Sequence, residues 1–515
     1  MTISRFILTM LLWMLSAQPS VALTRDEIAQ IETELGIQLS SQQIEQLDSI
    51  LNPSEVAQWR LDAHARIEEH RKADLHIRIV DVNEAPVRGA KVEVKLLKSA
   101  FKFGGVVHAH DLNDASGNLA SGGITSETWE RIVTALFNAV GTGNNFKPRQ
   151  SRLHHYLPRF LAWTAENDLD TRGHLLIWPG SKGIAEMDTP GSVIDDDYGK
   201  HLSKGLPESL NAVPGYEEVI SYNVEQALLD YKNSERTQAD KDALEAVVDS
   251  EITQWASLWN VYEWDVINET VNNRLLMDIM GFDQMAEWFK LAKLSMVNPK
   301  CKLLINDYQI ISAMDDSNAP AWANYINRRN IYMASIDRIL ADGGPLDRIG
   351  FQNRYKFGIP DPEITYRRLV EWGDKYSMEM VGTEFEVVDN PDGFSAFDFS
   401  EEERALITEQ TLTTYYSHPL VTGLFNWTFM HASDDKAMAY YDGSVKLNGL
   451  VWYYLHRIRF TTHKTSTTSS DGSIDLRAFK GEYKVNVTYE GQDYPAAFEL
   501  SEDKTLVIKL TDVAS

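Results

Sequence analysis

The stretch WDVINE, residues 264–269, is a short apolar run of strand character that ends in a glutamate. A second run of this kind, VGTEFEV, residues 381–387, contains Glu384. Short runs of mostly apolar residues are typical of strands that are buried on both faces in a parallel sheet. The sequence therefore predicts two buried strands, and each presents a carboxylate near one end.

Outward from these runs, short apolar segments alternate with longer amphipathic segments from Phe101 to Phe460. This alternation is typical of parallel strands that are joined by helical crossovers. Helix starts between them carry suitable caps, such as Asp361 before Pro362. We predict an α/β fold, a (β/α)8 TIM barrel over residues 101–460. Its eight strand candidates are residues 101–107, 137–144, 171–178, 261–269, 302–308, 349–354, 378–387 and 421–427.

One large insertion is expected after the third strand, at about residues 181–240, where Gly, Pro, Asp and Ser interrupt the pattern. Because it leaves the C-terminal end of a strand, it should overhang the mouth of the barrel. A decorative loop and a specificity element both fit its composition.

The N-terminal region divides into three parts. Residues 1–22 combine Arg5, an apolar stretch and small residues in cleavage-site spacing, which indicates a secretory signal peptide, with an uncleaved membrane anchor as the alternative. Residues 23–73 are predicted to be helical, with a capping box at Thr24 and Glu27 and a stop at Gly36. Residues 74–100 alternate apolar and polar side chains, and we expect a hairpin-like β unit.

The C-terminal region begins with a Thr/Ser-rich segment, residues 461–471, that is predicted to be a linker. Residues 472–515 alternate again and predict a small β domain. This domain is expected to be a stabilising appendage, and a glycan-binding module is the alternative.

The composition narrows the classes of partner. Acidic residues number 75 and basic residues 49, and the resulting net charge of -26 repels phosphate backbones and anionic lipid. We expect no nucleic-acid partner, and no membrane partner once the signal is removed. Cys301 is the only cysteine, so no internal disulfide can form, and a buried, inert thiol is predicted. Two histidine pairs, His108 with His110 and His154 with His155, lack the neighbouring carboxylate or cysteine residues expected of a metal site. Neither a metal nor another cofactor is therefore expected.

The two glutamates suggest a chemistry. They lie 384 − 269 = 115 residues apart, which spans three βα units and places them on strands four and seven, across the barrel mouth from each other. Two carboxylates facing one glycosidic bond can act as proton donor and nucleophile when they are roughly 5 to 5.5 Å apart. We expect burial and the anionic Glu384 to raise the pKa of Glu269, and hydrogen-bond donors to keep Glu384 charged.

Residues 101–460 resemble glycoside hydrolase family 10, the endo-β-1,4-xylanases. WDVINE resembles the acid/base motif of that family, and GTEFEV at 382–387 resembles its nucleophile strand. The resemblance implies a retaining mechanism in which Glu269 is the acid/base and Glu384 the nucleophile. Further matches imply sugar-binding roles at the strand ends for Asn144, Lys147, His174, Trp178, Tyr308, Gln352, Arg354 and Trp427. Asn268, beside the acid, is placed to hydrogen-bond a hydroxyl near the reacting carbon.

The chain departs from the family pattern at three positions. Arg354 stands where the family has a His that supports the nucleophile, Pro179 where it has a His after the third-strand Trp, and Gly143 where a Glu precedes Asn144. An arginine near Glu384 would lower the pKa of that carboxyl, but it is bulkier than His and permanently charged. We therefore expect these three changes to affect which sugar is bound more than the reaction that the two glutamates carry out.

Three functions remain open on this basis. The first is a secreted or periplasmic retaining hydrolase of β-1,4-xylan, whose partner is a plant-type or algal polysaccharide. The second is the same mechanism on another β-glycan, motivated by Arg354, Pro179 and the insertion. The third is a catalytically silent glycan-binding protein, motivated by the altered surroundings of Glu384.

Overall fold

The computed structural model describes residues 22–113, 124–180, 224–313, 324–355, 361–387, 399–431 and 436–510. The predicted signal peptide, except its last residue, and the first part of the predicted insertion lie outside these ranges. Among the helices of the described ranges, none is long and apolar enough to cross a membrane.

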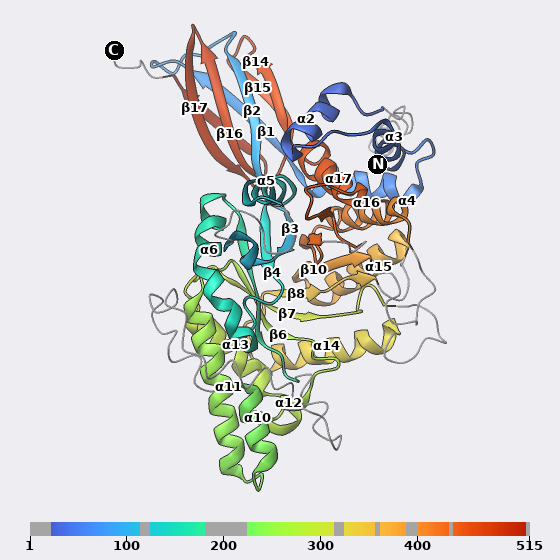
Figure 1. The fold of residues 1–515 in the computed structure, drawn as a ribbon. Coiled ribbons are helices and arrows are strands. Elements are labelled where there is room, and N and C mark those ends of the chain that lie inside the picture. Colours follow the sequence, from blue (N-terminus) through green and yellow to red (C-terminus); the bar gives the residue numbers. More distant parts are fainter. Residues whose placement is uncertain are drawn as a thin grey trace, which may run out of the picture.

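A closed barrel of parallel strands forms the centre of the molecule (Figure 1). Neighbouring strands pair in chain order, and the last strand, β11, pairs both with β10 and with the first strand, β3. The predicted barrel is confirmed, since each strand candidate overlaps one strand of the barrel, although β5 and β8 begin one residue before their candidates. The strands are β3 (Lys102–Val107), β4 (Ala139–Thr142), β5 (Asp170–Ile177), β6 (Glu263–Asn268), β7 (Lys302–Asp307), β8 (Arg348–Phe351), β10 (Glu379–Val387) and β11 (Val421–Asn426).

Helices cover the outside of this barrel. Asp361, as predicted, and Ser400 cap two of them, and each accepts a hydrogen bond from a backbone N–H of the first turn. The helices are α5 (Ser126–Leu136), α6 (Leu157–Glu166), α11 (Gln238–Leu258), α12 (Leu275–Met280), α13 (Gln284–Ser295), α14 (Tyr325–Ala341), α15 (Pro362–Tyr376), α16 (Glu401–Ser417) and α17 (Leu447–Tyr454). Short elements lie at the strand ends: η1 (Ala109–Asn113), η2 (Pro148–Tyr156), β9 (Arg354–Tyr355), β12 (Met430–His431), β13 (Ala439–Tyr440) and η5 (Leu455–Arg459).

The second part of the predicted insertion is helical. Helix α10 (Val224–Asn233) packs against α11, and the pair projects from the barrel (Figure 1). Thr237 forms a capping box with Asp240 at the start of α11. This part of the insertion is therefore an ordered helical pair.

The N-terminal region folds as predicted into helices, which are α2 (Arg25–Leu35), α3 (Ser41–Leu51) and α4 (Gln58–His70). Thr24 and Glu27 form the predicted capping box, and Gly36 ends α2 in the left-handed conformation, with φ of 66°. These helices pack on α5, α16 and α17. They therefore cover the outer helical layer next to the first and last strands of the barrel.

The remaining strands form two facing sheets, and here the structure corrects the sequence-based interpretation. The expected hairpin over 74–100 is absent, because β1 (Lys72–Val80) pairs with β15 and β18, whereas β2 (Lys91–Ser99) pairs with β14 and β16. The expected linker over 461–471 contains strand β14 (His463–Thr467). The other strands are β15 (Ser473–Phe479), β16 (Gly481–Tyr489), β17 (Gln492–Leu500) and β18 (Lys504–Lys509).

The physical reason is burial. The inward side chains of β1 and β2 are buried, with Ile77 and Val94 0% exposed, and a two-stranded hairpin alone could not cover them. Strands from both ends of the chain, blue and red in Figure 1, lie side by side and enclose one apolar core. Residues 472–510 are therefore part of a composite β sandwich, and are not a separate β domain.

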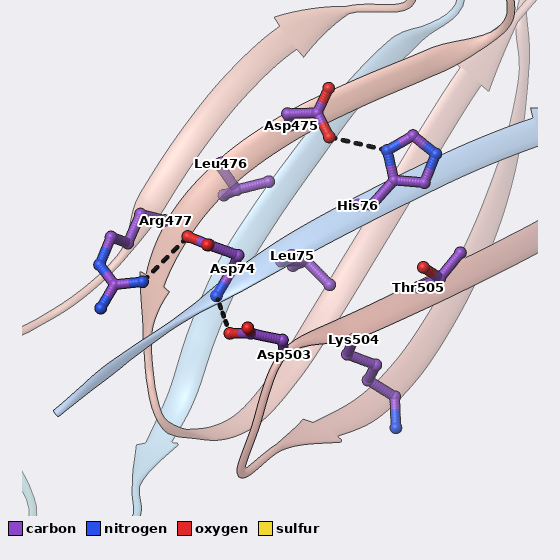
Figure 2. A pocket seen from close by; sticks show the side chains of 9 residues that line it. All are labelled: Asp74, Leu75, His76, Asp475, Leu476, Arg477, Asp503, Lys504 and Thr505. Atoms are coloured by element: carbon purple, nitrogen blue, oxygen red, sulfur yellow. Dashed lines mark hydrogen bonds and ion pairs between the residues drawn. The ribbon is translucent and has the colours of Figure 1, made fainter. Parts of the chain in front are cut away.

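The outer face of the β15-β1-β18 sheet is polar. Figure 2 shows a pocket of about 600 Å³ there, in which His76 Nδ1 lies 2.7 Å from Asp475 Oδ1 and Arg477 Nη1 lies 2.9 Å from Asp74 Oδ1. The Asp74 N–H also donates to Asp503 Oδ1 at 2.8 Å. These contacts join side chains that are about 400 residues apart in sequence.

The sandwich sits on the N-terminal face of the barrel. Arg71, just before β1, donates through Nη2 to the carbonyl oxygens of His418 and Val421, each at 2.6 Å, at the start of β11. The Phe101 ring, just before β3, packs edge-on against Tyr416, with ring centroids 5.0 Å apart. The opposite, C-terminal face is therefore left for the site.

Candidate active site

Both predicted catalytic glutamates lie toward the C-terminal ends of barrel strands. Glu384 belongs to β10 and is 3% exposed, whereas Glu269 directly follows β6 and is half-buried. Glu269 has a left-handed backbone, with φ of 64°, which is uncommon for a residue other than glycine. Its N–H donates to the Asn306 carbonyl at 2.7 Å and its carbonyl accepts from the Asn273 N–H at 2.9 Å, so both sides of the turn are fixed.

The Glu269 carboxylate receives two side-chain hydrogen bonds. Gln352 Nε2 donates to its Oε1 at 2.8 Å, and Asn273 Nδ2 donates to its Oε2 at 3.1 Å. Gln352 follows β8, as predicted from sequence, and Asn273 comes from the turn after β6. The side chain is therefore oriented from two neighbouring elements.

The Glu384 carboxylate is more deeply buried and more weakly bonded. Asn306 Nδ2 lies 3.5 Å from its Oε1, and His174 Nε2 lies 3.9 Å from the same atom. Burial raises the pKa of Glu384 to about 8, although Arg354 lowers it, and the nearby Glu269 raises it further. The expectation that donors would keep Glu384 charged is wrong for this ligand-free site, because desolvation outweighs its neighbours.

His174 is held by a buried ion pair beneath it. Its Nδ1 lies 2.6 Å from Asp265 Oδ2, and Asp265 also accepts from Arg172. Burial lowers the pKa of His174 to about 4, so the ring is neutral at pH 7. Because an ionised carboxylate can only accept, Nδ1 carries the proton and Nε2 presents a lone pair to Glu384. That arrangement suits a protonated Glu384 in the resting site.

Asn306 is a functional candidate that the sequence reasoning named only as part of a strand motif. Its Nδ2 donates to Asn268 Oδ1 at 3.1 Å, and its Oδ1 accepts from Thr383 Oγ at 2.8 Å. It thus links the end of β6, beside Glu269, to the strand that carries Glu384. The sequence feature that could have identified Asn306 is its position one residue before the end of strand β7.

Arg354 contacts a different carboxylate from the one expected. Its Nε donates to Glu386 Oε1 at 2.5 Å, and Glu386 Oε2 accepts from Thr428 Oγ at 2.7 Å. The Arg354 guanidinium also lies 5.6 Å from the centroid of the Trp427 ring. Arg354 still lowers the pKa of Glu384, as predicted in direction. Glu386 was missed, although its position two residues after Glu384 on one strand face was visible in the sequence.

The remaining predicted sugar-binding residues lie around this cluster. The Trp427 ring meets His174 edge-on with centroids 5.9 Å apart, and Lys147 Nζ lies 5.6 Å from the centroid of Trp178. Tyr308 lies farther along, under the Arg328 guanidinium at 4.3 Å, and Asn144 is exposed beside Trp427. Their contacts with sugar stay predictions.

Two further features bear on possible chemistry: the thiol of Cys301 and the grouping of side chains that could bind a metal ion. Cys301 is buried, as predicted, and burial raises the pKa of its thiol to about 12. Over the described ranges, no three His, Cys, Asp or Glu side chains are grouped as ligands for a metal ion.

Comparison with known proteins gives three kinds of match. Residues 226–437 match the model of glycosyl hydrolase family 10. Among curated proteins, the anti-sigma-I factor RsgI6 of Acetivibrio thermocellus is 22% identical over 448 residues, which cover 85% of this chain and 48% of that protein. This chain therefore spans about half the length of that relative.

Two solved xylanases are also similar to the chain. Xylanase 10B of Thermotoga maritima is 16% identical, and the match covers 68% of this chain and 94% of that one with a TM-score of 0.46. A thermostable mutant of xylanase Xyn10A of Cellvibrio japonicus is also 16% identical. That match covers 68% of this chain and 96% of the xylanase, with a TM-score of 0.46.

The family match contains the parts of the site that carry the chemistry. Residues 226–437 include β6 with Glu269, β8 with Gln352 and Arg354 after it, β10 with Glu384, and Trp427 after β11. Through this segment, part of the barrel is similar to glycosyl hydrolase family 10.

Proposed function

We propose that this protein hydrolyses the β-1,4-xylosidic bonds of xylan by double displacement, with retention of configuration. One observation carries the proposal. Glu384 accepts a hydrogen bond from the Asn306 side chain, and the Asn306 carbonyl accepts one from the Glu269 N–H, so one residue contacts both strand ends. The charge of Glu269 also acts on Glu384. Two carboxylates with unlike environments are the arrangement that this mechanism requires.

In the proposed first step, Glu384 attacks the anomeric carbon while Glu269 gives its proton to the leaving glycosidic oxygen. A covalent glycosyl–enzyme ester and a shortened chain result. In the second step Glu269 takes a proton from water, the resulting nucleophile attacks the anomeric carbon, and the bond to Glu384 breaks.

The charges around Glu384 support its role. Arg354, Lys147 and Arg172 each favour its ionised form, and only burial and Glu269 oppose them. For the first step the proton must reside on Glu269. Its hydrogen bonds from Gln352 and Asn273 favour an ionised carboxylate, so substrate binding must outweigh them. The aromatic rings of Trp178 and Trp427 offer apolar faces for sugar rings.

The decisive test is labelling with a mechanism-based 2-fluoro xylobioside inhibitor, followed by peptide mass spectrometry. We expect the label on Glu384, and Glu384→Gln to abolish it. Hydrolysis of xylan by Glu269→Gln and by Glu384→Gln should fall by several orders of magnitude. The matched control is Glu379→Gln, at the opposite end of β10, which should keep its rate per folded molecule. Unchanged rates in the first two variants would rule out their roles.

A catalytically silent glycan-binding protein is the second candidate. Two observations favour it: burial raises the pKa of Glu384 to about 8, and the closest carboxylate of Arg354 is Glu386. The relative RsgI6 is named as an anti-sigma-I factor, which is a regulatory protein. Absence of both turnover and labelling, with retained binding of xylo-oligosaccharides, would select this candidate.

The same mechanism on another β-glycan is a narrower alternative. Arg354 and Pro179 motivate it, because they alter the surroundings of the nucleophile and of Trp178. Product analysis on a panel of xylans and β-glucans separates the two possible substrates. Faster cleavage of a glucan than of xylan would identify the glucan as the substrate.

We also propose that residues 1–22 are removed on export and that the protein works outside the cytoplasm, in the periplasm or beyond it. The N-terminus of the protein isolated from the producing cells is expected at Leu23. A retained Met1 would contradict removal of the signal.

A further inference from the structure

A second pocket, of about 190 Å³, lies beside the Trp427 ring at the ends of β3, β4 and β11. Since Trp427 also contacts His174, which faces Glu384, this pocket is one aromatic ring away from the reaction centre. Its apolar wall includes Val107 and Phe429, and its polar groups come from His108, Asp111, Asn144 and His431.

Asp111 carries a buried oxygen in this pocket that has no close hydrogen-bond partner, although the Trp129 side chain interacts with its carboxyl group. Its side chain is 2% exposed, and Oδ1 makes no hydrogen bond to any residue within the described ranges. The closest ring nitrogen, His110 Nε2, is 3.6 Å away, beyond hydrogen-bonding distance. A buried oxygen in this state costs free energy that a bound hydroxyl group would recover.

The pocket exists because residue 143 has no side chain. The backbone of Gly143 does not require glycine, since its φ is not among the positive values of the chain. A Cβ at this position would meet Val106 at 3.5 Å and Trp427 at 3.6 Å, which are ordinary van der Waals contacts. A longer side chain would therefore fit the backbone and occupy the space between these walls.

We infer that this pocket binds one uncharged sugar branch, of pentose size, on the polysaccharide chain that lies across Trp427. The inference rests on the proposed function and names the substrate class more closely: a branched xylan. The volume corresponds to about six water molecules at roughly 30 Å³ each, which suits one small ring and not a disaccharide.

The chemistry of the pocket explains the choice of branch. When it is ionised, Asp111 accepts a hydrogen bond from a hydroxyl group, which an acetyl group lacks. Burial lowers the pKa of His108 to about 4, so this ring is neutral at pH 7 and does not attract an acid group. A uronic acid branch would bring its carboxylate next to Asp111, where like charges repel.

The test compares linear xylotetraose with xylotetraose that carries one arabinofuranosyl group, as O2-linked and O3-linked isomers. Binding to the Glu384→Gln variant of the full chain is measured by calorimetry, so the readout does not depend on turnover. We expect one branched isomer to bind about tenfold or more tightly than the linear chain, and Gly143→Leu to remove this preference. Asp111→Asn should reduce the preference while its thermal unfolding is unchanged.

Gly143→Ala is the matched control, because it adds the same Cβ but leaves most of the volume, and it should keep the preference. The glucuronosyl-branched tetraose should bind no better than the linear one. Equal binding of linear and both arabinosyl chains, or a preference that survives Gly143→Leu, would overturn the inference. If the preference is seen but wild type cleaves neither substrate, only the proposed hydrolysis fails.

Discussion

Glu384 and Glu269 differ chiefly in what surrounds each carboxylate. Glu384 is enclosed by the barrel and has one long hydrogen bond, from Asn306, whereas Glu269 is half-buried and accepts from Gln352 and Asn273. Placing a charge in a site with few donors is unfavourable, so Glu384 holds a proton until about pH 8. The protonation of Glu384 therefore affects both the pH dependence of the rate and the stability of the folded protein.

The first prediction concerns this stability. In the folded protein the pKa of Glu384 is raised above its unfolded value, so the folded state binds more protons between about pH 4.5 and 8, and stability falls as pH rises through this window. Glu384→Gln removes the titration and should raise the melting temperature by a few degrees at pH 8, and by less at pH 5. Thermal unfolding at both pH values measures this. Glu386→Gln, which deprives Arg354 of its partner, should instead lower the melting temperature.

The second prediction concerns the rate. Catalysis needs the form of the active site in which the two carboxylates together hold one proton. Since the pKa of Glu384 is raised to about 8, that form persists up to about pH 8 and is lost above it. The profile of kcat/KM on xylan should therefore decline on the basic side near pH 8. A decline near pH 5 would contradict the assigned proton.

At the scale of elements, the barrel strands are joined inside by a buried ionic network. Glu263 on β6 is 0% exposed and accepts from Arg172 Nε on β5 at 2.9 Å and from Arg348 Nη1 on β8 at 2.7 Å. Arg348 also reaches Glu379 on β10 at 2.7 Å. Strands on opposite sides of the barrel are thereby fixed in register below the site.

This network gives the third prediction. Glu263→Gln removes the carboxylate that Arg172 and Arg348 share. Each arginine keeps one other carboxylate, Asp265 or Glu379, but the buried network loses a charge and the free energy of unfolding should fall by about 3 kcal/mol. Glu287→Gln, which breaks an exposed pair with Lys290 on α13, should lower it by less than about 0.5 kcal/mol. Urea denaturation compares the two variants, and equal effects would show that the network does not stabilise the barrel.

At the scale of the whole molecule, the composite sandwich joins both ends of the chain on the face of the barrel opposite the site. Strands β14 to β18 cover the apolar faces of β1 and β2, and Phe479 of β15 packs near Tyr416 of α16, with ring centroids 6.2 Å apart. The C-terminal strands therefore stabilise the N-terminal strands and the barrel together.

The fourth prediction follows from this closure. Deletion of residues 463–515 would expose the inward side chains of β1 and β2, so the truncated protein should be insoluble or should unfold several degrees below the full chain. Asp475→Ala, which removes only the exposed contact with His76, should unfold with the full chain. Soluble truncated protein with an unchanged melting temperature would show that the C-terminal strands are dispensable.

The sequence by itself determined the barrel, the order of its strands and the positions of Glu269, Glu384, Gln352 and Arg354 at strand ends. The strands follow from local periodicity, whereas the choice of Gln352 and Arg354 as site residues came from the resemblance of their strand to the family motif. Tertiary structure alone decided which distant groups meet: β1 with β18, Arg354 with Glu386, Asn306 with Asn268, and Asp111 with the pocket at Gly143. Burial also decided the raised pKa of Glu384, because the loss of solvent depends on the whole closed barrel and on no single stretch of sequence.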